Sequence, residues 1–183
     1  MRRLLCLLAL FLVPLFLCAQ GMKKADLKQA VDAVGAVVDD WHLAAAEGDE
    51  ARYFGHLSAD AVFVGLDETQ RWSKNAFREW TSAAFKQKQM WTFRSSERHV
   101  SLSPAGDVAW FEELLDTPGM GVARGTGVLV KQGDAWQIAQ YALSLPIPPR
   151  AFPEVLEVIR VQKLLPKDEA KTPKPQPQPT DGK

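Results

Sequence analysis

Apolar residues between residues 25 and 47 recur at steps of three and four, the spacing of one face of an α-helix. The face consists of Leu27, Ala30, Val31, Val34, Val38, Trp41 and Ala45. The pattern predicts a helix that Gly48 ends. Asp49 can cap a second, short helix over residues 50–57. Ser73 can cap a third helix, whose apolar face holds Phe77, Trp80, Ala84 and Phe85.

Three strand-length apolar runs follow one another over residues 108–116, 122–131 and 135–143. Turn-forming residues separate them, with a Thr-Pro-Gly at 117–119 and a Gln-Gly-Asp at 132–134. Strand-length runs separated by short turns predict an antiparallel meander. Two earlier strands are expected over residues 61–65 and 91–103, the second of which ends at a turn over 104–107.

The element order is therefore helix, helix, strand, helix and four antiparallel strands. Helices that precede an antiparallel sheet are typical of an α+β domain. We expect a curved, cone-shaped sheet packed on the N-terminal helices, with an aromatic-lined cavity between them. We expect residues 22–149 to form this domain. Residues 150–165 are expected to form a C-terminal helix that runs from Pro153 to Leu165, because Pro is tolerated in the first turn of a helix.

Residues 1–21 are typical of an export signal. Arg2 and Arg3 precede an apolar run over residues 4–17, which is shorter than the ~20 residues needed to cross a bilayer. Cleavage after Ala19 or after Gly21 would release the protein to the periplasm or the exterior. Lipidation at Cys18 is a further alternative. Met22 could also start a shorter form.

Composition narrows the function classes. The chain has 22 basic and 22 acidic side chains, and loss of Arg2 and Arg3 with the signal leaves a net charge of −2. Nucleic-acid binding is therefore disfavoured. The two cysteines lie at positions 6 and 18, so the mature domain has no disulfide or thiolate metal site. Residues 166–183, rich in Pro and Lys, are expected to be a disordered tail.

Several segments together resemble the SnoaL-like domains of the nuclear transport factor 2-like superfamily, whose fold is also called cystatin-like. They cover about residues 30–149. The matching segments are Trp41-His42, Gly48-Asp49, Phe-Gly-His-Leu at 54–57, Asp-Ala-Val-Phe-Val-Gly-Leu-Asp at 60–67, Arg71-Trp72, Ala-Trp-Phe-Glu-Glu-Leu at 109–114, Arg-Gly-Thr-Gly-Val-Leu at 124–129 and Trp-Gln-Ile-Ala-Gln-Tyr at 136–141. The superfamily hosts isomerases, cyclases, dehydratases and binding modules, so the fold alone specifies no reaction.

Two adjacent acids, Glu112 and Glu113, lie in the middle of an apolar strand. Strand alternation sends one inward and the other outward. Packing of Trp110 against the helices would place Glu112 in the cavity, whereas the resemblance implies that Glu113 is the cavity acid. A carboxyl in an apolar cavity can serve as a general acid or base. The alternative for Glu113 is a structural ion pair with Arg124 on the neighbouring strand.

The remaining candidates follow from residue type and place. His99 on the long strand is the candidate for proton transfer, and Arg124 or Tyr141 could polarise a ligand oxygen. Asp67 lies in the loop where the cavity opens. The resemblance implies an acid near position 70, where this chain has Gln70, which counts against an activity that needs it. The aromatic residues expected to line the cavity are Trp72, Trp80, Trp91 and Trp110.

Two functional hypotheses remain. The first is an exported ligand-binding or accessory module, a homodimer through the outer face of the sheet, that takes a small apolar or aromatic molecule. The second is an isomerase, cyclase or dehydratase that uses Glu113 or Glu112 for proton transfer. No cofactor and no metal are expected, because the histidines lack metal-ligand spacing.

Overall fold

The computed structural model describes residues 23–88 and 90–164. The predicted export signal over residues 1–21, the lipidation site at Cys18 and the predicted tail over 166–183 lie outside the described residues. No helix among those described is both long and apolar enough to span a bilayer.

The predicted helices form close to the expected bounds. They are α1 (Lys24–Glu47), α2 (Glu50–Gly55), α3 (Lys74–Lys86) and α4 (Phe152–Leu164), with a short 3-10 turn, η1 (Pro149–Ala151), before the last. Gly48 ends α1 in a left-handed conformation, with φ of 70°. The Asp49 carboxylate accepts from the Arg52 N–H, and the Ser73 hydroxyl accepts from the Ala76 N–H. Both predicted caps are confirmed.

Six strands form one sheet in the order β2-β1-β6-β5-β4-β3. Their bounds are β1 (Leu57–Val64), β2 (Arg71–Ser73), β3 (Arg94–Leu102), β4 (Val108–Thr117), β5 (Gly121–Gln132) and β6 (Ala135–Ser144). The meander β3-β4-β5-β6 is antiparallel as predicted, and β1 runs parallel to β6. The α+β class is confirmed. Strand β2 went unpredicted, because three residues are too few to show an alternation.

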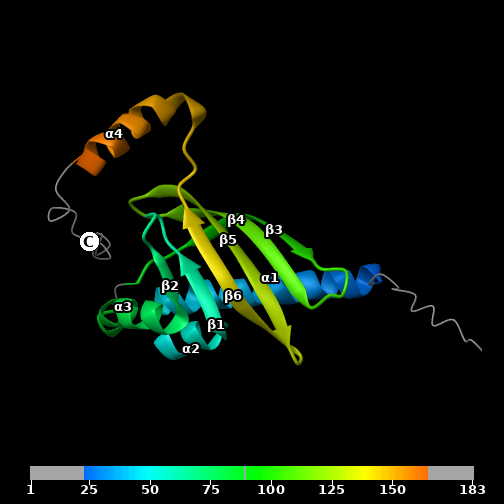
Figure 1. Ribbon diagram of the computed structural model, residues 1–183. Helices are drawn as coiled ribbons and strands as arrows, with labels where there is room; N and C mark the ends of the chain where they lie inside the picture. Colours follow the sequence, from blue (N-terminus) through cyan, green and yellow to red (C-terminus); the bar gives the residue numbers. More distant parts are fainter. Residues whose placement is uncertain (1–22, 89, 165–183) are drawn as a thin grey trace, which may run out of the picture.

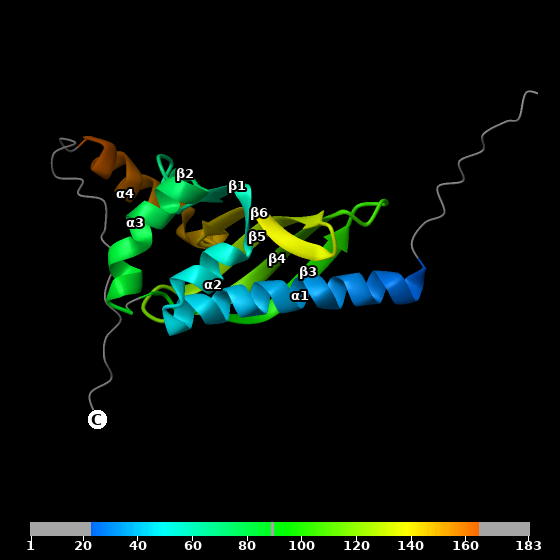
Figure 2. The same ribbon diagram turned by 90° about the horizontal axis from the view of Figure 1, so that it is seen from below.

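Helices α1, α2 and α3 gather on one side of the curved sheet (Figure 1). Seen from below, α1 runs along the concave face, and α2 and α3 cover the end of the sheet near β1 and β2 (Figure 2). Strand alternation then divides the sheet into two faces. Ala109, Phe111, Glu113 and Leu115 of β4 are buried toward α1, whereas Trp110 and Glu112 are exposed on the other side.

The space between the sheet and the helices holds a packed aromatic cluster. The Phe63 and Phe77 rings stack at 4.0 Å, and Trp41 lies between Tyr53 at 5.1 Å and Tyr141 at 4.7 Å. The prediction that aromatic residues gather here is confirmed. An aromatic-lined cavity was expected between the curved sheet and the helices, whereas the rings fill much of that space by packing on one another.

Helix α4 stands away from the sheet beyond the end of β6 (Figure 1). Its bounds agree within two residues with the expected C-terminal helix. Several of its apolar side chains are exposed, namely Phe152, Leu156, Val158, Ile159 and Val161.

Candidate functional site

The centre of the candidate site is the carboxylate of Glu113, which is 1% exposed. It projects from β4 toward α1, so Glu113 is the inward acid, in agreement with the resemblance. His42 of α1 donates from Nε2 to Glu113 Oε1 at 2.7 Å. Arg98 of β3 donates from Nε and from a terminal nitrogen to Glu113 Oε2, at 2.9 and 2.7 Å. The carboxylate thus has charged or polar partners on both oxygens.

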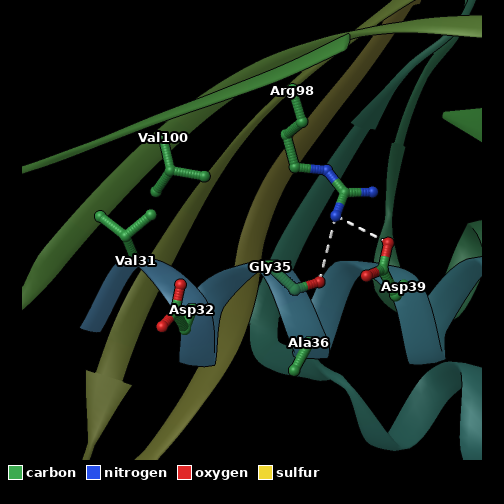
Figure 3. A pocket seen from close by; sticks show the side chains of 7 residues that line it. All are labelled: Val31, Asp32, Gly35, Ala36, Asp39, Arg98 and Val100. Atoms are coloured by element: carbon green, nitrogen blue, oxygen red, sulfur yellow. Dashed lines mark hydrogen bonds and ion pairs between the residues drawn. The ribbon is translucent and has the colours of Figure 1, made fainter. Parts of the chain in front are cut away.

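Arg98 connects this carboxylate to the first helix. Its second terminal nitrogen donates to the Gly35 carbonyl at 3.1 Å and to the Asp39 carboxylate at 2.7 Å. Figure 3 shows the side chain reaching down from β3 to these two residues of α1. The predicted pair between Glu113 and Arg124 is therefore wrong. Arg124 opposes Leu114 and projects from the other face of β5, so its side chain cannot reach the buried carboxylate.

The surroundings of Glu113 shift its pKa in opposite directions. Burial raises the pKa, but the hydrogen bond from His42 and the charges of His42 and Arg98 outweigh it and leave the pKa below its usual value of 4.5. In return, Glu113 raises the pKa of Arg98 against the effect of burial. Glu113 is hence an ionised, fully partnered carboxylate at neutral pH.

Two buried donors beside this network have no acceptor among the described residues, namely the Trp41 Nε1–H and the Tyr141 hydroxyl. Burial, followed by the charge of Glu113, raises the pKa of Tyr141 well above 10. The hydroxyl lies over Gly125, where a Cβ would meet it at 2.4 Å and Glu113 Oε1 at 3.2 Å. Buried polar groups nearly always have a partner, so this polar spot within the aromatic cluster is suited to an oxygen acceptor.

Other predicted site residues lie on the opposite face of the sheet. His99 of β3 pairs in register with Glu112 of β4, and both are exposed there with Arg124. Trp110 is 45% exposed on the same face. These four side chains cannot contact a ligand in the interior together with Glu113, because the sheet lies between them. An open pocket of about 370 Å³ borders this face, lined by Glu97, His99, Glu112, Glu113, Leu114 and Arg124. The Glu113 carboxylate itself is directed inward, to His42.

The remaining predicted aromatic residues form a half-buried rim on the α3 side. Trp72 stacks on Trp80 at 5.0 Å, and Trp91 stacks on Phe93 at 6.1 Å. Asp67 lies in the loop between β1 and β2, where its carboxylate accepts from the N–H and hydroxyl of Thr69. That contact is the turn chemistry expected of an Asp at such a place.

The sequence interpretation missed His42 and Arg98, although a signal for each was present. His42 follows Val38 by four residues, which places it on the buried face of α1. Arg98 lies on the same face of β3 as Val100 and Leu102, which project toward the helices. A charged residue on an inward-facing position indicates a buried partner of opposite charge.

A second open pocket, of about 390 Å³, lies beside Arg98 between β3 and α1 (Figure 3). Its lining residues are Val31, Asp32, Gly35, Ala36, Asp39, Arg98 and Val100. Both pockets therefore border the sheet from outside the aromatic cluster.

Comparisons with solved structures agree with this architecture. A nuclear transport factor 2-like protein of unknown function from Pseudomonas putida KT2440 is 19% identical, with a TM-score of 0.57 over 72% of this chain and 94% of its own. A proposed dehydratase of the same family from Streptomyces avermitilis is 17% identical, with a TM-score of 0.57 over 66% and 99%. A protein of unknown function with a cystatin-like fold from Nostoc punctiforme is 14% identical, with a TM-score of 0.56 over 71% and 98%. At these identities the likeness shows the fold alone.

No curated protein matches the chain. The profile of the SnoaL-like domain, in contrast, matches residues 34–148, which is more than half of the 183-residue chain. The match begins in α1 and ends just after β6, so it includes all six strands and every residue of the Glu113 network. The fold of this chain is that of the nuclear transport factor 2-like protein described above. Since the profile covers more than half of the chain, the protein belongs to the SnoaL-like domain family.

Proposed function

We propose that this domain is an exported, non-catalytic binding or accessory module that takes a small apolar or aromatic ligand between the sheet and the helices. The observation that carries the proposal is the pair of unpartnered donors, Trp41 Nε1–H and Tyr141 hydroxyl, inside the aromatic cluster. A buried donor without an acceptor costs about 1–3 kcal/mol. A ligand oxygen that accepts from either group would remove that group's cost, while the rings of the ligand stack on the aromatic side chains.

The charges nearby restrict the ligand. Glu113 is ionised and lies beside the Tyr141 hydroxyl, so a second carboxylate at that place would be repelled. A neutral oxygen, such as that of a ketone, can accept from the Tyr141 hydroxyl without this penalty. The rim of Trp72, Trp80 and Trp91 is the proposed entrance, because these aromatic side chains are only partly buried against the core.

The alternative is an isomerase, cyclase or dehydratase that transfers a proton through Glu113. The short contact between Glu113 Oε1 and His42 Nε2 favours it, because such a pair can pass a proton. The lowered pKa of Glu113 counts against it, since a carboxylate that releases its proton so readily is a weak base near neutral pH. The binding role is therefore preferred.

A matched pair of probes tests the binding proposal. Acetophenone carries a ketone oxygen, and ethylbenzene has nearly the same shape without it. We expect the mature protein to bind the ketone at least fivefold more tightly, measured by tryptophan fluorescence. Tyr141→Phe should reduce that preference toward one, whereas Tyr53→Phe, also buried in the cluster, should preserve it. Equal binding of both probes to the unaltered protein would contradict the proposal.

Identification of a natural ligand needs a separate measurement. Native mass spectrometry of the protein after gentle purification should show a bound small molecule with a neutral oxygen and an apolar body. Repeated preparations without any bound mass, combined with no response to the aromatic probes, would count against a role in ligand binding.

We further propose that the module acts outside the cytoplasm as a homodimer. The apolar run of residues 4–17 behind Arg2 and Arg3 supports export. Trp110 and Val122, which are 45% and 56% exposed on the outer face of the sheet, support a dimer through that face. N-terminal sequencing of the secreted protein should find a chain that starts at Gln20 or Met22. A lipid-modified start at Cys18 would assign the membrane-anchored alternative.

A further inference from the structure

Strand β3 is an edge of the sheet. The strand order places it last after β4, and its nine residues from Arg94 to Leu102 pair with β4 alone. Within residues 23–88 and 90–164, no backbone hydrogen bond joins the other side of β3 to a further segment. An edge strand of this length offers alternating N–H and C=O groups to which another strand can pair.

The pocket beside β3 lies where the side chains of an added strand would project. Paired strands run about 4.7–4.9 Å apart, with their side chains in register on the same face. The inward side chains of a seventh strand would therefore lie next to Arg98 and Val100, above α1. This is the place of the pocket of about 390 Å³, whose other lining residues all belong to α1 (Figure 3).

Small residues leave room along this part of α1. Gly35 has no side chain, and a Cβ added there would meet only a terminal nitrogen of Arg98, at 3.9 Å. Ala36 follows it on the exposed side of the helix. Val31 from α1 and Val100 from β3 add apolar surface at one end of the pocket.

The residues that line the pocket include two acids and one cation. Asp32 and Asp39 carry carboxylates whose side chains are 61% and 69% exposed. Arg98 is the only cation in the lining, and its charge already faces the buried carboxylate of Glu113. Asp32 already pairs with Lys28. An incoming cation therefore meets the exposed carboxylate of Asp39, which Arg98 contacts through Oδ1. An apolar side chain fits beside Val31 and Val100.

We propose that the edge of β3 binds an extended peptide segment by strand addition. The segment has a Val or Leu seated beside Val31 and Val100, and a Lys or Arg two residues away that faces Asp39. The spacing follows from strand alternation, because Arg98 and Val100 are themselves two residues apart on β3. This surface is separate from the aromatic interior, so it is a second binding site with a different class of ligand.

The probe is the capped peptide Thr-Val-Thr-Lys-Thr-Val-Thr, whose alternation matches the proposed segment. NMR titration of the mature protein should shift the backbone amides of β3 and of α1 around Gly35. N-methylation of one set of alternate peptide amides should weaken binding at least tenfold, whereas methylation of the other set should change it less than threefold. That asymmetry is specific to pairing along one peptide edge.

Substitutions in the protein test the pocket beside Arg98. Ala36→Leu places a larger side chain in the pocket and should weaken peptide binding at least tenfold. The protein should still fold, because position 36 is exposed. Ala83→Leu, at an exposed alanine of α3, is the matched control and should leave binding unchanged. Replacement of the peptide's Lys with Glu should weaken binding at least fivefold, through repulsion by Asp39.

Three results would overturn the proposal. One is the lack of any β3 shift at millimolar peptide. Another is equal loss with both methylated peptides, which indicates side-chain adsorption without strand pairing. The last is a concentration-dependent dimer, seen by sedimentation, in which the β3 amides are protected from hydrogen exchange before peptide is added. In that case a second copy of this chain occupies the edge.

Discussion

At the scale of single residues, the protein depends on how it compensates one buried charge. Glu113 is almost fully enclosed, and a carboxylate in such a place is strongly unfavourable unless it is paired. Arg98 and His42 provide the partners from a strand and from a helix. These contacts join β3, β4 and α1, so the side chain of Glu113 connects three elements.

Arg98→Met tests this compensation. The substitution retains the length of the side chain and leaves Glu113 without its cationic partner. We expect the free energy of unfolding to fall by roughly 3–5 kcal/mol, as for other broken buried pairs. Urea titration measures the change. Arg71→Met, at an exposed arginine of β2, should change stability by no more than about 0.5 kcal/mol. Similar losses in both variants would show that the buried pair has no special role.

Two carboxyl groups, those of Asp40 and Glu113, make the free energy of unfolding depend on pH. The hydrogen bond from Arg52 lowers the pKa of Asp40 to about 2, and Glu113 also has a lowered pKa. Because the unfolded chain binds protons more tightly at these groups, their contribution is complete above their usual pKa values of 3.8 and 4.5 and is lost as the pH falls below them. Unfolding free energy should therefore decrease from about pH 5 downward. Asp40→Asn should reduce that decrease, and an unchanged acid dependence would contradict the assignment.

At the scale of elements, the packing of β4, β5 and β6 requires a glycine. Gly125 lies between Glu113 on β4 and Leu143 on β6, and the Tyr141 ring covers its Cα. A strand usually loses stability at glycine, so a glycine here indicates close approach by a neighbour. The neighbour is the hydroxyl end of Tyr141, which brings the polar spot next to the carboxylate.

Gly125→Ala tests that close approach. The new methyl group would lie 2.4 Å from the Tyr141 oxygen, so the ring or the strand must move. We expect a loss of about 1–3 kcal/mol in unfolding free energy, as for other overpacked cores. Thermal unfolding, followed by circular dichroism, measures it. Gly55→Ala serves as the control, because a Cβ at Gly55 would have no neighbour within 4 Å. An equally stable Gly125→Ala protein would contradict the close packing.

At the scale of the whole molecule, the sheet separates two surfaces of different character. The inner face holds the aromatic cluster and the Glu113 network, and the outer face exposes Trp110 and Val122 among charged residues. The separation explains why neighbouring residues such as Glu112 and Glu113 have unrelated surroundings. The proposed dimer belongs to the outer face, and the proposed ligand belongs to the inner one.

Trp110→Glu tests the proposed dimer. A charge at the centre of an apolar contact would remain unpaired against its symmetry mate, so the variant should be monomeric where the unaltered protein is dimeric. Analytical ultracentrifugation of the mature protein measures the mass. Leu43→Glu, at an exposed leucine of α1, should leave the dimer intact. A dimer that survives Trp110→Glu must use another surface.

Much of the fold could be predicted because its signals are local. The spacing of Val34, Val38 and Trp41 defines α1, and the turns around Gly119 and Gly133 separate β4, β5 and β6. The short strand β2 could not be predicted in this way, since it exists only by pairing with β1. The same limit applies to the parallel pairing of β1 with β6, which joins segments far apart in the chain.

The sequence by itself determined the α+β class, the helix caps and the alternation that makes one of Glu112 and Glu113 inward, because each depends on a few consecutive residues. Only the tertiary structure decided that Glu113 binds Arg98 and His42, and that His99 and Arg124 lie on the far side of the sheet. Ion pairs and cavities depend on the distance between elements. Chain folding sets that distance, and no local pattern of residues records it.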